Sequence, residues 1–215
     1  MRILFVASEG LPFSKTGGLA DVLEALPKAL AAQGFEVAVV LPRYRGTKPG
    51  PSVIPSLTIP LANHLRFPAV MDGSLISGVR YFFVDDPAYF DRDGLYGDSA
   101  GDFPDNAERY SEFCRAAIEL VKQAWPADVI HCHDWQTALL PVLLRTSYGD
   151  DPAVSDIPVV FTIHNMGYHG LFPRDVLDRA GIAQGVYHPA GLEFFGKVNF
   201  LKGGLIYSDY LTTVS

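Results

Sequence analysis

The sequence predicts an α/β fold: a doubly wound, mostly parallel sheet with helices on both faces and a small β insertion. Short, continuous apolar runs, which are typical of strands buried on both faces of a parallel sheet, recur along the 215-residue chain. Segments with apolar residues at helical spacing separate most of these runs. This alternation indicates an open sheet that binds its ligand beyond the carboxyl ends of the strands.

The elements of the first part follow from these patterns in order. Residues 3–7 form a first buried strand, and a glycine-containing loop follows at 9–18. Residues 19–33 place their apolar side chains on one side of a helix, which Pro27 is expected to kink or to divide. Residues 37–41 form the second buried strand.

The middle of the chain interrupts this alternation. Pro and Gly separate short β-rich pieces, such as 79–84, within residues 53–84, so we expect a hairpin-like insertion there. A polar loop at 85–105 then leads into a helix at 106–125, whose apolar residues recur at helical spacing.

Strand and helix alternate again in the last part. Strands are expected at 129–132 and 159–163, with a helix at 136–144 between them. A long mixed region with a late helix leads to a last strand at 210–214. The chain stops inside this strand-like run, which favours a cut at a domain boundary; the alternative is a natural terminal strand.

Composition narrows the classes of partner. The apolar content of 48% and charged content of 19% are those of a globular chain. A net charge of −7 disfavours nucleic acid and an anionic membrane surface, because both require a basic face. The chain has neither an apolar run of about 18 residues nor a signal peptide, and its two cysteines, Cys114 and Cys132, form no framework. We expect a cytoplasmic protein.

The first polar cluster, Lys-Thr-Gly-Gly at 15–18, opens a helix. Gly17 and Gly18 allow a ligand to approach the backbone closely, the helix start offers free N–H groups, and Lys15 adds a positive charge. Together these features suit a phosphate or diphosphate. The alternative is a tight turn with a solvated lysine.

The second cluster, His-Cys-His-Asp-Trp at 131–135, follows a strand. Alternate side chains of a strand point to opposite faces, and no second Cys/His pair stands at zinc spacing, so we expect no metal. An indole beside a carboxylate, Trp135 beside Asp134, suits a sugar. The alternative is that Asp134 is a helix N-cap and that Trp135 is packed in the core.

The third cluster, His-Asn-Met-Gly-Tyr-His-Gly at 164–170, also follows a buried strand. His164 and Asn165 have side chains that bond sugar hydroxyls. The alternative is a loop whose side chains bond their own backbone. No nucleophilic triad can be assigned.

Three motifs together resemble those of the glycogen and starch synthases, glycosyltransferase family five. They are Lys-Thr-Gly-Gly-Leu-Ala-Asp-Val at 15–22, His-Asp-Trp at 133–135 and His-Asn at 164–165, and the stretch 191–215 is similar as well. The resemblance covers essentially residues 1–215 and implies the Rossmann-like N-terminal domain of a GT-B enzyme, with its C-terminal domain absent. It implies retaining transfer of glucose from ADP-glucose to the non-reducing end of an α-1,4-glucan, without metal or cofactor.

The resemblance also implies residue roles. Residues near the donor ADP-glucose would be Lys15, Gly17, Gly18, Asp21 and Asn165. Residues on the acceptor side would be Tyr96, Asp134 and Trp135. His164 and Asp134 would be catalytic, while His169 stands where many relatives carry glutamine and its role is open. Most of the adenine and diphosphate contacts would lie in the absent domain.

Three other classes remain for comparison. The first is another GT-B transferase that uses a different nucleotide sugar; the combination of Lys-Thr-Gly-Gly with His-Asp-Trp disfavours it. A non-catalytic glucan-binding module would not need a lysine and two glycines at a helix start. A nicotinamide-dependent dehydrogenase predicts GxGxxG and an acidic residue after the second strand, where this chain has Pro42-Arg43-Tyr44.

Overall fold

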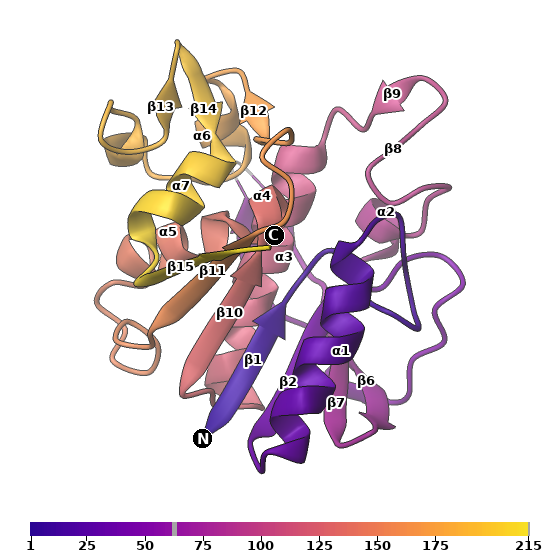
Figure 1. Ribbon diagram of the computed structural model, residues 1–215. Helices are drawn as coiled ribbons and strands as arrows, with labels where there is room; N and C mark the ends of the chain where they lie inside the picture. Colours follow the sequence, from indigo (N-terminus) through magenta and orange to yellow (C-terminus); the bar gives the residue numbers. More distant parts are fainter. Residues whose placement is uncertain (62–63, 215) are drawn as a thin grey trace.

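The computed structural model describes residues 1–61 and 64–214 and is built on an eight-stranded sheet (Figure 1). The sheet has the strand order β15-β11-β10-β1-β2-β7-β6-β3. Its parallel strands are β1 (Arg2–Val6), β2 (Glu36–Pro42), β7 (Val79–Asp85), β10 (Val129–His133), β11 (Val159–Ile163) and β15 (Tyr210–Thr213). Its antiparallel strands are β6 (Ala69–Ile76) and β3 (Ser52–Ile54). The predicted fold class, α/β with a mostly parallel sheet, is confirmed.

The hairpin predicted for residues 53–84 is present as β6 and β7, but its second strand is a full member of the central sheet. Strand β7 pairs in parallel with β2, from Val37 opposite Val79 to Pro42 opposite Val84. The apolar run of β7 is buried on both faces, as a central strand requires. The predicted insertion is therefore limited to the residues before β7. These include a two-stranded antiparallel sheet, β4 (Ile59–Leu61) and β5 (His64–Arg66).

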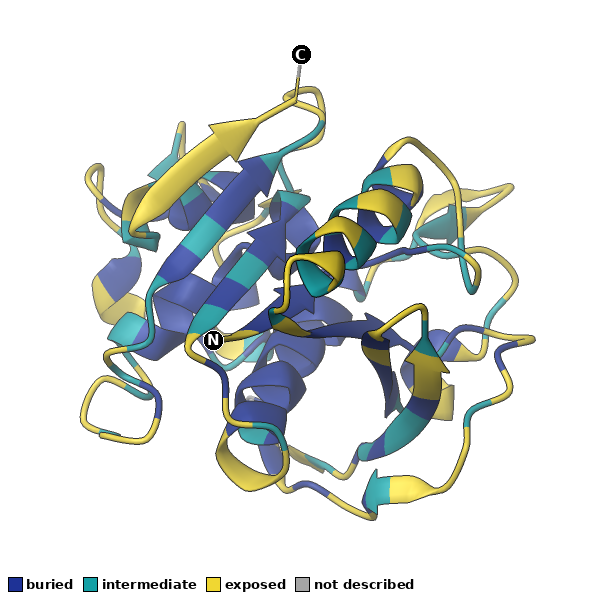
Figure 2. Cartoon of the chain, turned by 60° about the horizontal axis from the view of Figure 1, so that its bottom comes forward, coloured by how far each residue is buried: buried dark blue, intermediate teal, exposed yellow. Residues whose placement is uncertain are grey.

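Helices cover both faces of the sheet. Helix α1 (Leu19–Ala32) lies on one face, where its Leu23 packs with Phe5, Val39 and Phe83. The other face carries α3 (Asn106–Gln123), α5 (Leu139–Arg145) and α7 (Phe200–Tyr207). Figure 2 shows the buried central strands beside β15, which is exposed along its whole length.

Two helix predictions change in detail. Helix α1 runs continuously through Pro27, so no second piece begins there. The helix predicted at 136–144 is instead two helices, α4 (Asp134–Thr137) and α5, which separate at Ala138. Pro141 lacks the N–H that a continuous helix would direct to the carbonyl of Thr137, which accounts for the break.

Short elements complete the chain. A small antiparallel sheet consists of β12 (Leu171–Phe172), β14 (Lys197–Asn199) and β13 (Glu193–Phe194). The remaining elements are α2 (Pro87–Phe90), β8 (Gly97–Asp98), β9 (Gly101–Asp102), α6 (Val176–Arg179) and the 3₁₀ helix η1 (Gln184–Val186). Within the described ranges, no helix combines the length and the apolar character needed to cross a membrane.

Arg109 fixes the loop between β7 and α3 to the core. Its guanidinium is completely buried and donates from Nε to the carbonyl of Tyr89 at 2.8 Å and from Nη2 to that of Leu95 at 3.2 Å. It also donates to the Asn106 side chain at 2.5 Å, and Asn106 in turn donates to the carbonyl of Tyr96 at 2.8 Å. The position of Tyr96 therefore depends on this buried arginine.

We expect Arg109→Met to lower the free energy of unfolding by about 3 kcal/mol, because the buried Tyr89 carbonyl and the buried Asn106 side-chain oxygen lose their donor. Urea denaturation of the wild-type and variant proteins measures the difference. Arg80→Met is the matched control, since the Arg80 side chain is 47% exposed; it should change stability by less than about 0.5 kcal/mol. A loss below about 1 kcal/mol for Arg109→Met would contradict the assigned role.

Candidate functional site

The three polar clusters meet at one edge of the sheet, as their positions after parallel strands predict. Strands β1, β10 and β11 are adjacent and parallel, so the segments that follow them leave the same edge. These segments surround a cavity of about 640 Å³. The predicted site residues that line it are Gly17, Gly18, Tyr96, Trp135, His164 and Asn165.

Three predicted site residues do not line this cavity. Lys15 and Asp21 form an ion pair, with Lys15 Nζ 2.6 Å from Asp21 Oδ1, and both side chains are about half exposed. Asp134 is not a lining residue, but its carboxylate accepts hydrogen bonds from the backbone N–H groups of His164 and Asn165, which are lining residues. Lys15 is thus close to the glycine turn, but its charge is directed to Asp21 in this structure.

Glu9, which the sequence analysis did not single out, organises the glycine turn. Its side chain is buried and its carboxylate accepts hydrogen bonds from the Thr16 N–H, from Thr16 Oγ1 at 2.8 Å and from the Gly17 N–H at 3.3 Å. The Gly17 N–H is therefore already used. Within residues 1–61 and 64–214, the N–H groups of Gly18 and Leu19 have no protein acceptor.

Gly18 leaves open space at the start of α1. Its φ of −71° and ψ of −18° are accessible to any residue, so the backbone does not require glycine. A Cβ placed there would have no neighbour within 4 Å. The missing side chain thus keeps the helix N-terminus accessible from the cavity, where its free N–H groups and positive partial charge suit an anion.

Asp134 connects the second cluster to the third. Its backbone is left-handed, with φ of 57°, and its Oδ1 accepts from the His164 N–H at 2.7 Å and from the Asn165 N–H at 3.4 Å. The N-cap position of α4 belongs to His133, so Asp134 does not cap its own helix but holds the neighbouring loop. Burial raises the pKa of this carboxyl, and the bond from the His164 N–H opposes that change.

Trp135 is packed more tightly than a free sugar platform would be. The residue is 9% exposed, and its ring lies 5.3 Å from that of Tyr110 and 5.8 Å from that of Phe172. Gly170 has φ of 61°, and a Cβ there would lie 2.6 Å from Trp135 Cε3. The indole therefore presents only a small surface to the cavity and to an adjoining one of about 350 Å³.

Tyr96 approaches the site from the loop that Arg109 holds. Its hydroxyl lies 2.8 Å from Ser8 Oγ, next to the end of β1. Burial raises the pKa of Tyr96 well above its ordinary value, so the phenol stays protonated. Tyr96 thus joins the β7–α3 loop to the same edge of the sheet.

Three histidines form an array that reaches the cavity: His133 is buried, His131 and His164 are half-buried, and His164 lines the cavity. His131 and His133 stack with ring centroids 4.3 Å apart, and His133 Nδ1 lies 2.9 Å from His164 Nε2. His133 Nε2 is buried and has no partner in the described structure. Burial lowers the pKa of His131 to about 4, lowers that of His133 well below its ordinary value and lowers that of His164. The array is therefore uncharged at neutral pH, and it fixes the His164 ring.

The array is not arranged as a metal centre. In the part of the chain that the structure describes, no group of three or more His, Cys, Asp or Glu side chains could hold a metal ion. His131 and His133 stack instead of converging, and Cys132 is buried and free. His169, whose role the sequence left open, has its Nδ1 3.4 Å from the Asn199 amide nitrogen.

The low pKa of His131 predicts acid sensitivity. Above pH 6.5 the His131 ring is neutral in both the folded and the unfolded protein, so it does not destabilise the folded state. As the pH falls towards 4, the ring gains a proton in the unfolded protein only, and the free energy of unfolding decreases. We expect His131 to account for a loss of about 3 kcal/mol in the free energy of unfolding by pH 4.

Urea denaturation at several pH values measures this, with His131→Gln compared against wild type. Burial raises the pKa of Glu112 to about 8, so this residue makes the folded protein more stable as the pH falls below 8. The comparison with His131→Gln is needed to separate the contribution of His131 from this opposite effect. The exposed His64→Gln is the control. Parallel pH profiles for wild type and His131→Gln would contradict the expectation.

Comparisons with known proteins all identify starch and glycogen synthases as the relatives of this chain. A family model described as the starch synthase catalytic domain matches residues 2–215. The glycogen synthase of Koribacter versatilis is 54% identical over 217 residues, and that of Geotalea uraniireducens is 43% identical over 225 residues. Both alignments cover 100% of this chain and 45% of the relative, so the chain spans about half the length of the curated relatives it matches.

A solved structure with the same fold extends the comparison. The catalytic domain of starch synthase IV from Arabidopsis thaliana, bound to ADP and acarbose, superposes with a TM-score of 0.87 at 30% identity. The match covers 99% of this chain and 44% of that one.

Proposed function

The chain belongs to the family of starch synthase catalytic domains, and from this premise we propose that the whole protein transfers glucose from ADP-glucose to the non-reducing end of an α-1,4-glucan with retention of configuration. Residues 1–215 would be its N-terminal, Rossmann-like domain of the GT-B type. A second, C-terminal domain would supply the opposite wall of the cleft. The relatives are about twice as long as this chain, which covers 45% of them, and this supports a second domain.

The observation that carries the proposal is the 640 Å³ cavity, with a helix N-terminus on one side and a neutral histidine on the other. The free N–H groups of Gly18 and Leu19 suit the diphosphate of a nucleotide sugar. The ADP and acarbose in the Arabidopsis structure are a nucleotide and a carbohydrate, which supports the same two ligand classes here.

The donor would bind at the glycine turn. Gly18 would admit the diphosphate, and Gly17 would shape the turn through its bond to Glu9. Lys15 would turn from Asp21 towards the phosphates once they arrive, since an exposed ion pair contributes little. Asn165 would bond the transferred glucose.

The acceptor glucan would lie along Tyr96 and Trp135, beside the loop that Asp134 holds through the His164 N–H. The adjoining cavity of about 350 Å³ would be its continuation. Transfer with retention develops positive charge on the sugar and negative charge on the leaving diphosphate. Because burial lowers the pKa of His164, its imidazole stays neutral and does not oppose the sugar cation. We expect no metal or cofactor in this reaction.

The proposal is tested with the protein at its full natural length. Radiolabelled glucose should pass from ADP-glucose into glycogen, and the new bonds should be released by an α-1,4-specific amylase. UDP-glucose in place of ADP-glucose distinguishes the other nucleotide-sugar transferases. Glucan binding that no nucleotide sugar affects, with no incorporation, would favour the non-catalytic binding module.

A further inference from the structure

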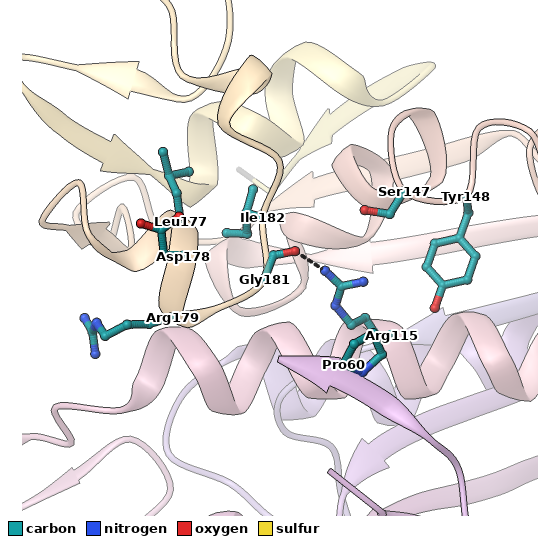
Figure 3. A pocket seen from close by; sticks show the side chains of 9 residues that line it. All are labelled: Pro60, Arg115, Ser147, Tyr148, Leu177, Asp178, Arg179, Gly181 and Ile182. Carbon is teal, nitrogen blue, oxygen red and sulfur yellow. Dashed lines mark hydrogen bonds between the residues drawn. The ribbon is translucent and has the colours of Figure 1, made fainter. Parts of the chain in front are cut away.

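A second and larger cavity, of about 840 Å³, shares no lining residue with the candidate site (Figure 3). It lies between α3, the turn after α5, α6 and the β4 strand. Its apolar walls are Pro60, Leu177 and Ile182. Its polar lining includes Arg115, Ser147 and Tyr148. The proposed glucosyl transfer uses none of these residues.

Arg115 is a buried cation without an anionic partner. The residue is 4% exposed, its Nη2 donates to the carbonyl of Gly181, and its Nε is buried without a partner among residues 1–61 and 64–214. Of the acids one turn away on α3, Glu112 accepts from Arg66 at Oε2 while its Oε1 has no partner among the described residues. Glu119 is bonded to Lys122 and Gln123. A buried guanidinium is costly unless an anion joins it, so this arrangement suits a bound anion.

The neighbours of Arg115 in the cavity wall include a phenol donor, Tyr148, and a carboxylate, Asp178. Burial raises the pKa of Tyr148 to about 12, so its phenol remains a protonated donor. Asp178, on the opposite wall, accepts from Gln184 Nε2 at 2.7 Å. Arg179 points away from the cavity and is paired with Glu108 and Asp175. Among the described residues that line the cavity, Arg115 is therefore the cation without an acidic partner, and Asp178, which accepts from a neutral amide, is an acid without a cationic partner.

We propose that this cavity is a binding site for a small phosphate ester, whose phosphoryl group meets Arg115, Ser147 and Tyr148. The three side chains offer at least three donors, which matches the three terminal oxygens of a phosphate better than the two of a carboxylate. The cavity of about 840 Å³ exceeds what an isolated ion fills, and the apolar wall suits the body of an organic ligand.

Calorimetric titration of the full-length protein with inorganic phosphate, a hexose 6-phosphate and malonate tests the proposal. The hexose phosphate should bind, and Arg115→Lys should weaken it at least about tenfold, because a fork of charged donors is lost. Tyr148→Phe should weaken it about threefold, through one hydroxyl. The matched control Arg80→Lys makes the same substitution at an arginine whose side chain is 47% exposed, and it should change the affinity less than about twofold.

The remaining outcomes separate the sources of the anion. Equal affinity for inorganic phosphate and the ester would support phosphate binding with free phosphate as the occupant, while a tighter ester would support contacts with the apolar wall. Malonate binding as tight as the ester would overturn the preference for phosphate. Undetectable binding of both phosphates, or binding unchanged in Arg115→Lys and Tyr148→Phe, would overturn the site. Tyr148→Phe keeps the test decisive if Arg115→Lys fails to fold.

Discussion

The 215-residue chain alone is expected to incorporate no measurable glucose from ADP-glucose into glycogen, although it folds. It should fold because its sheet is buried on both faces over its central strands. It should fail as a catalyst because donor and acceptor must be held together and shielded from water, and orientation of this kind contributes about 7–11 kcal/mol. Only one wall of the proposed cleft is present, and water weakens each remaining charge interaction.

The measurement compares radiolabel incorporation by this chain and by the full-length protein at equal concentration. Circular dichroism and a cooperative thermal transition serve as the control, since they separate a folded but inactive chain from an unfolded one. A folded chain whose turnover equals that of the full-length protein would show that the site is complete within residues 1–215, and the two-domain proposal would fail.

We expect Asp134→Ala, made in the full-length protein, to lower kcat about 10²–10³-fold, the range found when a fixed hydrogen-bonding group of an active site is removed. The substitution removes the acceptor of the His164 N–H, 2.7 Å away, and puts alanine at a φ of 57°. The loop that carries His164 and Asn165 then loses its anchor. Steady-state kinetics with ADP-glucose and glycogen measure the change.

Asp134→Asn is the matched comparison, because asparagine tolerates the left-handed backbone and keeps a carbonyl oxygen at Oδ1. If Asp134 acts mainly by positioning the loop, Asp134→Asn should retain most of the activity that Asp134→Ala loses. If both variants lose the same activity while their melting temperatures match that of wild type, the charge itself is needed. Full activity in Asp134→Ala would remove Asp134 from the proposed site.

The sequence was sufficient for five of the parallel strands, β1, β2, β10, β11 and β15, and for the edge at which the clusters meet. Apolar runs such as 159–163 indicate strands clearly, because a strand that is buried on both faces is apolar at nearly every position and does not alternate with polar residues. Polar residues after such runs then had to lie at one edge, whatever the strand order. The position of β7 in the sheet could not be predicted in the same way. The Pro and Gly residues before β7 suggested a separate unit, and its pairing with β2 joins segments that are far apart in the sequence.

The details of the site depended on contacts that no local pattern carries. The bond from Gly17 to Glu9 crosses a loop, and its only sequence signal was that Glu9 follows the first strand. The pairing of His133 with His164 joins the last residue of β10 to the first residue after β11, 31 positions along the chain. The role of Asp134 towards a neighbouring loop, in place of its own helix, follows from a left-handed backbone that the sequence did not indicate.

The candidate cavity is lined by residues from both ends of the described chain, from Glu9 to Val214. Strand β1 lies inside the sheet and β15 lies at its edge, so the cavity exists only when the strands between them are assembled. A ligand that fills it therefore binds the native state and not a partly folded one. By mass action, a ligand at 100 times its Kd would raise the global free energy of unfolding by about 2.7 kcal/mol, and binding would be readable as a shift of one cooperative melting transition.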